Sequence, residues 1–373
     1  MWAGFIAYLG VLAVSPRLPP ALVWGLIGVA VAGFAAAPVL LSHDVYSYVS
    51  YARLGVVHGL DPYVYAPQAA PADAIYPRVA WTEARSAYGP LFTLATYPLA
   101  WLPVTAAVAV LKAVAALSVA GLAWVVSRIA AWRGLEPARA AAFVALNPLV
   151  LVHVVGGAHN DGLTALLAMT AVAAGLSARW AGAGASMVAA VAIKASAAVL
   201  APFLLLAALR PPTPHPPAFA ASARMRPGLR TPLALAAGAA GAGLAIAVAA
   251  GIAFGWDWVG AFGLAGENQD RTSHMSAPIT LARLTGLGPD AVRGAAVALY
   301  GAALIYLLVR VWRGFDWVRA AGWASLGLLL ATAWLLPWYL VWVLPLAAVS
   351  RDRPLRILAL ALSAYQLGAR IPL

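Results

Sequence analysis

The chain has 373 residues, of which 64% are hydrophobic and only 10% are charged. Soluble domains contain roughly 45–50% apolar and about 25% charged residues, so this composition, with a mean hydropathy of +0.86, excludes an ordinary soluble protein. In a soluble protein, a net charge of +12 would suggest a nucleic-acid partner. The distribution of the charges along the chain shows whether they mark such a partner or the topology of membrane spans. No cysteine is present, which excludes disulfides and thiolate metal sites.

Apolar runs of roughly 17–25 residues predict helices that cross a bilayer. The first run, residues 2–14, lacks a basic start and a cleavage motif, so we expect a short span rather than a signal peptide. The later predicted spans are residues 21–41, 104–126, 140–155, 162–176, 185–209, 233–254, 289–311, 317–336, 339–349 and 357–367. The predicted fold is all-α: one integral membrane domain, 1–373, with about 10–12 membrane helices, some short or broken.

The charges sort onto two sides of these spans. Most arginines, including Arg133, Arg179, Arg224 and Arg351, fall on one side, and most acids fall on the other. By the positive-inside bias the arginine-rich side is cytoplasmic. The basic balance therefore reflects topology and gives no support to nucleic acid as a partner.

Three loops stand out. The first, residues 42–90, is expected outside the cytoplasm and is too long for a mere connection; it begins with an amphipathic helix that Ser42 or His43 can cap and that Gly59 ends. Residues 210–232 form a proline- and arginine-rich cytoplasmic loop, and residues 256–288 a second extracytoplasmic loop. If residues 185–209 crossed the membrane once, the next loop, residues 210–230, would lie outside the cytoplasm with its four arginines. This contradicts the positive-inside bias. We therefore predict that residues 185–209 form two short arms that meet near Lys194.

Asp44 lies within one turn of the end of a predicted span, where a carboxylate can act as a general base. The alternative is that Asp44 only benefits from the helix dipole at the first turn. His43 beside it could share the proton or act as a cap.

The segment His159-Asn160-Asp161 follows two glycines and opens a helix. It could merely cap that helix, or it could face Asp44 and hold sugar hydroxyls, since amide and carboxylate groups bind hydroxyls in pairs. A metal held by His159 and Asp161 is a third interpretation, which this spacing supports weakly.

Two lysines interrupt apolar segments. Placing an ammonium group in the apolar interior costs free energy unless it has a partner. The Lys194 side chain therefore either extends its ammonium to the membrane–water interface or holds a phosphate where the two arms meet. Lys112 has no role that the sequence suggests. Trp338 and Tyr339 after Pro337 fit an aromatic belt, and Tyr88-Gly89-Pro90 fits a turn.

Taken together, several motifs resemble the GT-C class of integral membrane glycosyltransferases. They are the Asp44 loop, 59–63 (GLDPY), 88–91 (YGPL), Asn147-Pro148, 157–161 (GAHND), Lys194 and 337–342 (PWYLVW). Within that class the chain is similar to the polyprenol-phosphate-mannose-dependent alpha-1,6-mannosyltransferases of actinobacterial lipomannan synthesis. The resemblance runs from about residue 21 to residue 350, and this chain is shorter than expected for the family.

The resemblance implies an inverting transfer without metal or other cofactor from a polyprenyl-phosphate sugar donor to a lipid-linked glycan acceptor, on the extracytoplasmic face of the cell membrane. It implies Asp44 as the catalytic base, with Lys194 and Arg53 holding the donor phosphate. The residues expected to bind sugar or acceptor are His43, Tyr46, Tyr48, Asp61, Tyr63, Tyr88, His159, Asn160 and Asp161. Trp338 and Tyr339 are expected in the groove for the lipid tail.

The competing interpretation is a polytopic transporter or lipid flippase, which would have repeated halves and a site at mid-membrane. No repeat is visible and the polar residues gather in loops on one side, although the break at Lys194 fits both functions. A structural membrane protein is a third option, which the length and polarity of the first loop disfavour.

Overall fold

The computed structural model describes residues 2–210, 230–263 and 271–368. Over these ranges the chain is helical and contains no strand, as the sequence predicts. The predicted loop at 210–232 falls mostly outside the described residues, as do residues 264–270 of the predicted second loop.

Three helices are long and apolar enough to cross a membrane. They are α5 (Val104–Trp132), α10 (Arg230–Phe254) and α13 (Pro289–Trp312). Only 11% and 6% of the most apolar windows of α10 and α13 are buried, so apolar side chains such as Ile252 and Leu299 point outward, where lipid would cover them. The chain is a membrane protein.

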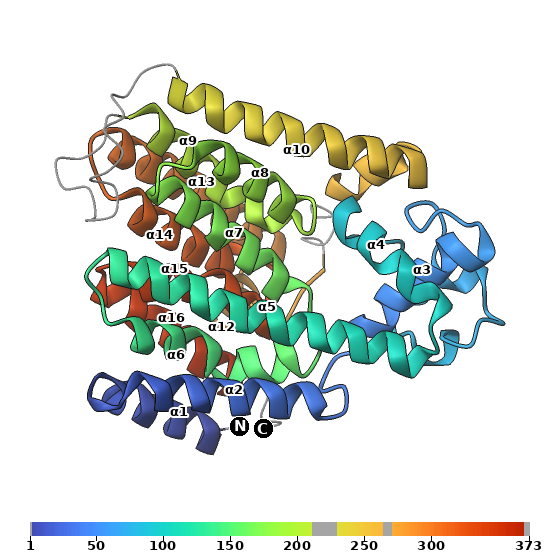
Figure 1. Cartoon of the computed structure of the whole chain (residues 1–373), viewed down its shortest axis with the longest axis horizontal. Helices are drawn as coiled ribbons and strands as arrows, with labels where there is room; N and C mark the ends of the chain where they lie inside the picture. Colours follow the sequence, from blue (N-terminus) through green and yellow to red (C-terminus); the bar gives the residue numbers. More distant parts are fainter. Residues whose placement is uncertain (1, 211–229, 264–270, 369–373) are drawn as a thin grey trace.

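Shorter helices complete the bundle. They are α1 (Trp2–Val14), α2 (Pro20–Ala36), α6 (Pro137–Ala145), α7 (Asp161–Leu176), α8 (Trp180–Val191), α9 (Ala201–Leu209), α12 (Ala277–Thr285), α14 (Trp317–Ala331), α15 (Leu344–Val349) and α16 (Arg353–Gly368). In Figure 1, α5 runs across the molecule, with α3 (Asp44–His58) and α4 (Pro90–Thr96) at one end and α1, α6 and α16 toward the other.

Several predicted spans are broken. The predicted span 140–155 divides after α6 because Pro148 cannot continue the helix, and a π-helical turn follows at Val150–Val155. Asn147 stabilises this break: its side chain accepts a hydrogen bond from the Leu149 backbone N–H and donates one to Ser363. After α14, the 3₁₀ turn η9 (Pro337–Trp342) likewise leads into α15.

The predicted break near Lys194 is also present. α8 ends at Val191, Lys194 has an extended backbone with φ −154° and ψ 124°, and the 3₁₀ turn η6 (Ala195–Leu200) then leads into α9. The predicted break is therefore confirmed, whereas two arms that begin and end on the same side of the membrane stay a prediction.

The first loop folds into a compact unit. Its helix α3 stops before Gly59, as predicted, and Gly59 adopts a left-handed φ of 65° that glycine takes up without strain. Short 3₁₀ turns η2 (Pro67–Ala69), η3 (Tyr76–Arg78) and η4 (Tyr97–Trp101) follow, and η8 (Asp257–Gly260) lies in the second loop. Val45, Tyr48 and Val49 of α3 are buried in a cluster with residues of α4 and α5. The apolar face of α3 is therefore covered by protein.

Candidate active site

Two polar turns are held together by backbone contacts. The chain leaves α2 as an extended segment, and the Leu40 backbone N–H donates to Gly156 O at 3.1 Å. Lys112, which the sequence left without a role, donates from α5 to Ala37 O, to Pro38 O and to Gly156 O. Its buried charge is thereby satisfied, and the start of α3 is fixed beside the turn that opens α7.

Asp44 begins α3 at this junction. Its Oδ1 accepts a hydrogen bond from Trp81 Nε1 at 3.0 Å, and its Oδ2 lies 3.6 Å from His159 Nδ1. Burial of the carboxyl raises the pKa of Asp44, and the Trp81 hydrogen bond and the charge of Lys194 offset this only in part. A carboxylate with a raised pKa is a stronger base, which suits proton abstraction.

Asp161 and Lys194 form an ion pair next to Asp44. Lys194 Nζ lies 2.8 and 2.9 Å from the two carboxylate oxygens of Asp161, whose side chain is fully buried. Trp342 Nε1 donates to Asp161 Oδ1 at 2.8 Å, and the Lys194 ammonium lies 4.8 Å from the centre of the Tyr339 ring. Lys194 has a third N–H, which these contacts leave available for a further acceptor.

His159 and Asn160 complete the cluster. The His159 ring stacks on Trp338, with centroids 3.8 Å apart and planes 20° apart. The amide of Asn160 is buried, and neither its oxygen nor its nitrogen has a hydrogen-bond partner within the described structure. An unsatisfied buried amide is costly, so Asn160 is a ready partner for the hydroxyl of a ligand.

Trp338 and Tyr339 lie at the polar cluster. Both were assigned to a groove for the lipid tail, but Trp338 packs on His159, and Tyr339 stacks on Trp342 and beside Lys194. They are therefore walls of the polar cluster. Local sequence could not show this, because the same aromatic spacing also fits a membrane-interface belt.

The end of the first loop docks on the break at Lys194. The Gly89 backbone N–H donates to Ile193 O at 2.9 Å, and the Leu91 N–H donates to Ala192 O at 3.0 Å. Tyr88 beside them packs edge-on against Tyr48, with centroids 4.8 Å apart, and its backbone oxygen accepts from Tyr63 OH at 3.0 Å. These contacts link Tyr48, Tyr63 and Tyr88 at this junction.

We expect Gly89→Ala to damage this junction. A Cβ on Gly89 would lie 2.1 Å from Ala192 O, so backbone must move, and thermal unfolding of the purified protein should show a loss of about 1–3 kcal/mol. Gly28→Ala in α2 is the matched control, because a Cβ there meets nothing within 4 Å. Equal stability of both variants would show that the Gly89 contact is unimportant.

The remaining predicted site residues are Arg53, Asp61, His43 and Tyr46. Arg53 pairs with Asp73: its Nε lies 2.8 and 3.0 Å from the Asp73 carboxylate, its Nη1 donates to Ala100 O, and its backbone lies about 14 Å along α3 from Asp44. Asp61 accepts from the Tyr63 backbone N–H in a turn. His43 is exposed, makes no side-chain cap and lies 5.9 Å from the Tyr46 ring.

Trp81 and Arg271 are candidate site residues that the sequence did not reveal. The guanidinium of Arg271 lies 5.1 Å from the centre of the Trp81 ring, and Trp81 in turn binds Asp44. Arg271 belongs to the predicted second loop, so both loops meet at Asp44. The sequence offered one signal for these contacts, the isolated Trp81 in a long loop. The residues near Trp81 in the sequence do not indicate that it contacts Asp44 or Arg271.

We expect Trp81→Phe to change the pH dependence of activity. The ring and its contact with Arg271 can remain, but loss of the N–H removes a group that lowers the pKa of Asp44. That pKa should rise further, so more Asp44 is protonated at a given acidic pH and the acid limb of kcat/KM moves to higher pH. A pH–rate profile of both proteins measures this, and an unchanged acid limb would dissociate Trp81 from the ionisation of Asp44.

The backbone is strained at both turns. Leu41 and Ala158 have φ values of 53° and 56°, in the left-handed region that residues with a Cβ rarely adopt. Such strain persists only where surrounding contacts enforce it. Leu41 is held next to the Leu40–Gly156 hydrogen bond, and Ala158 lies one residue before His159.

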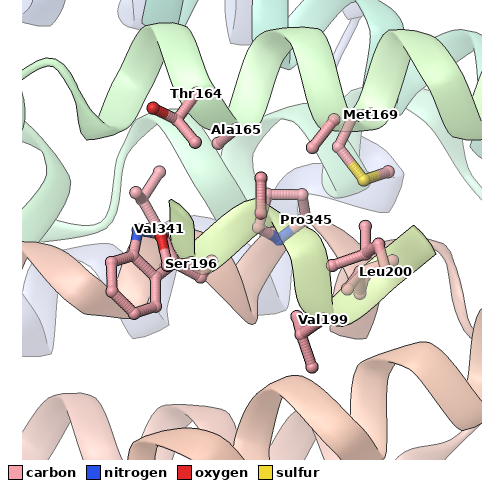
Figure 2. A pocket seen from close by; sticks show the side chains of 12 residues that line it. Thr164, Ala165, Met169, Ser196, Val199, Leu200, Val341 and Pro345 are labelled. Carbon is pink, nitrogen blue, oxygen red and sulfur yellow. The ribbon is translucent and has the colours of Figure 1, made fainter. Parts of the chain in front are cut away.

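A small pocket of about 20 Å³ lies beside Trp342. Figure 2 shows Thr164, Ala165 and Met169 of α7 on one side, with Ser196 and Leu200 below them. Its volume holds about one water-sized group, so it is too small for a prenyl chain.

Within the described ranges no three His, Asp or Glu side chains are grouped so that they could hold a metal ion. His159 and Asp161, the pair considered from the sequence, instead contact Trp338 and Lys194 respectively.

Two family models match parts of the chain. A family model described as "Alpha-(1->6)-mannopyranosyltransferase, N-terminal domain" matches residues 4–210, and one described as "MptB C-terminal domain" matches residues 274–371. No solved structure matches the chain.

Three curated relatives are similar over part of the chain. Alpha-(1->6)-mannopyranosyltransferase A of Mycobacterium tuberculosis is 33% identical over 184 residues, which are 47% of this chain and 35% of the relative. The protein of the same name from Corynebacterium glutamicum is 30% identical over 175 residues, 46% and 35% of the two chains. A probable alpha-(1->6)-mannopyranosyltransferase of Mycolicibacterium smegmatis is 32% identical over 135 residues, 34% and 24%. The matched segments span about a quarter to a third of these relatives.

Proposed function

The chain belongs to the alpha-(1->6)-mannopyranosyltransferase family, and from this membership we propose that it transfers mannose from a polyprenyl-phosphate donor to a lipid-linked alpha-1,6 mannan acceptor. The observation that carries the proposal is the half-buried Asp44 carboxylate beside the Asp161–Lys194 pair. A base and a cation thus lie side by side where two loops meet.

Asp44 is the general base of the proposed reaction. The acceptor hydroxyl oxygen attacks the anomeric carbon, and its proton passes to Asp44. The bond from that carbon to the phosphate oxygen breaks, and its electron pair leaves with polyprenyl phosphate, so the configuration inverts. The leaving phosphate is already ionised and needs no general acid, only positive charge to stabilise it.

Lys194 supplies that positive charge. Asp161 fixes the ammonium through two hydrogen bonds and leaves its third N–H for the phosphate. Arg271 above Trp81 is the second cation in this region and takes the role first assigned to Arg53. Both cations lie outside the long apolar helices, which agrees with a phosphate at the interface, because charge is expensive deeper in the membrane.

The sugar binds between the two turns. Asn160 offers an unsatisfied amide, and amides pair well with adjacent hydroxyls. The stacked His159 and Trp338 rings form a flat wall beside it. The prenyl tail then lies in an apolar groove between membrane helices.

The test is direct transfer. Purified protein is incubated with polyprenyl-phosphate-mannose and a lipid-linked mannan acceptor, and product is identified by mass spectrometry. We expect one added hexose in alpha-1,6 linkage and none with a nucleotide-sugar donor alone. Absence of product with the lipid donor, together with transfer from a nucleotide sugar, would reject this proposal.

We also propose that the active site faces away from the cytoplasm. Because the chain has no cysteine, one introduced at exposed Ala72 in the first loop should react with an impermeant thiol reagent in intact cells. One at exposed Arg313, on the arginine-rich side, should react only after the cells are permeabilised. The reverse pattern would place the active site in the cytoplasm.

A further inference from the structure

A second, larger cavity lies at the opposite end of α5 from Asp44. It measures about 660 Å³ and opens between α1, α6 and α16. These helices lie away from α3 and α4 in Figure 1. The cavity therefore has no part in the site described above.

Three arginines line this cavity without a carboxylate partner. In the described parts of the chain, Arg139, Arg353 and Arg356 make no ion pair, and the charges of Arg139 and Arg353 both act unfavourably on Arg356. The acids nearby are engaged elsewhere. Glu136, which also lines the cavity, caps α6 through the backbone N–H groups of Ala138 and Arg139.

Asp352 is the second acid close to this cluster. Its carboxylate pairs with Arg319 and accepts a hydrogen bond from Trp323 Nε1 at 2.8 Å. Its charge also acts favourably on Arg356, but no ion pair joins the two side chains. Three neighbouring cations that pair with no carboxylate of the described residues favour an anionic ligand.

The remaining walls are apolar. Leu9 and Leu12 of α1, Phe143 of α6, and Ile357 and Leu360 of α16 line the cavity. Leu9 and Ile357 are 40% and 52% exposed, so the cavity is continuous with an outward apolar surface. A free phosphate ion would leave these walls unused, whereas a lipid has both an anionic end and an apolar end.

We propose that this cavity binds an anionic phospholipid. Its phosphate lies against Arg139, Arg353 and Arg356, and an acyl chain follows Leu9 and Leu360 toward the membrane. Basic pockets between membrane helices on the cytoplasmic side bind acidic headgroups in this way. The arginine-rich end of the chain is the one that the positive-inside bias assigns to that side. The proposal does not depend on mannose transfer.

The test measures lipid binding to the whole protein in detergent by native mass spectrometry. We expect one phosphatidylglycerol to bind in preference to phosphatidylcholine. Each arginine near an acidic headgroup contributes about a fivefold gain in affinity. Arg353→Gln should therefore weaken binding about fivefold, and the triple variant Arg139→Gln/Arg353→Gln/Arg356→Gln on the order of 100-fold.

The matched control is Arg128→Gln/Arg179→Gln/Arg313→Gln, which removes the same charge from exposed positions toward the same side. It should bind phosphatidylglycerol as the wild type does. Equal losses in the two triple variants, equal binding of both lipids, or displacement of phosphatidylglycerol by millimolar inorganic phosphate would each overturn the proposal. If the cavity triple variant does not fold, Arg353→Gln carries the test, and its unchanged affinity would overturn the proposal equally.

Discussion

Replacing Asp44 by Asn should lower turnover by about 10²–10⁴-fold while donor binding survives. The amide keeps the shape and an oxygen that can accept from Trp81, but it cannot take the acceptor's proton. Turnover with saturating donor, and donor affinity on the same preparation, measure the two effects separately. Glu83→Gln is the matched control, since Glu83 is an exposed carboxylate of the same loop and its loss should leave turnover unchanged.

Stability separates this role from a purely structural one. Asp44 is the first residue of α3, and if it served only the helix dipole, its loss would lower stability by roughly 0.3–1 kcal/mol with activity intact. Burial instead raises its pKa in the folded protein. A group whose pKa is higher in the folded than in the unfolded protein stabilises the fold at pH values below its pKa in the unfolded protein. This contribution is lost as the pH rises through its pKa in the folded protein. At neutral pH, the Asp44→Asn variant should therefore unfold at no lower temperature than the wild-type protein. Near-normal turnover of the variant would exclude Asp44 as the general base.

Replacing Lys194 by Met should weaken both the fold and the donor site. The Asp161 carboxylate is fully buried, and removal of one partner of a buried ion pair costs about 3–5 kcal/mol, because it leaves a charge uncompensated. Thermal unfolding should show this loss. Donor binding should fall as well, since the contact to the phosphate disappears.

The double variant Lys194→Met/Asp161→Asn distinguishes the two effects. It removes both charges, and the amide oxygen that replaces the carboxylate can still accept from Trp342, so most of the stability should return. Donor affinity should stay low, because no cation remains at this position. If the double variant recovers normal donor binding, Lys194 serves only to neutralise Asp161. A single variant with unchanged stability and donor affinity would mean that the ammonium extends to the membrane interface instead.

Much of the architecture is readable from the chain itself. Long apolar runs identify membrane helices because a bilayer requires about 20 apolar residues per crossing. The α3 helix and its stop at Gly59 follow from local periodicity and from the conformational freedom of glycine. The break at Lys194 followed from the arginines of the next loop, through the positive-inside bias. Helices at 140–155 and 317–336 were predicted too long, because proline and 3₁₀ or π turns interrupt apolar segments without changing their hydropathy.

For the candidate site, too, the sequence predicted some features and not others. The sequence drew attention to Asp44 by its place at the end of a predicted span, to Asp161 by its place at the start of a helix, and to Lys194 by its isolation in an apolar segment; all three are local properties. Their partners are not local. Lys194 binds a carboxylate 33 residues away, and Trp81 reaches Asp44 across 37 residues.

Only the tertiary structure decided that Arg53 belongs to Asp73, and that Trp338 faces His159 rather than lipid. The reason is physical. Backbone hydrogen bonds from Leu40 to Gly156 and from Gly89 to Ile193 bring the loops together, and nothing in the spacing of residues along the chain encodes which carbonyl each N–H will find.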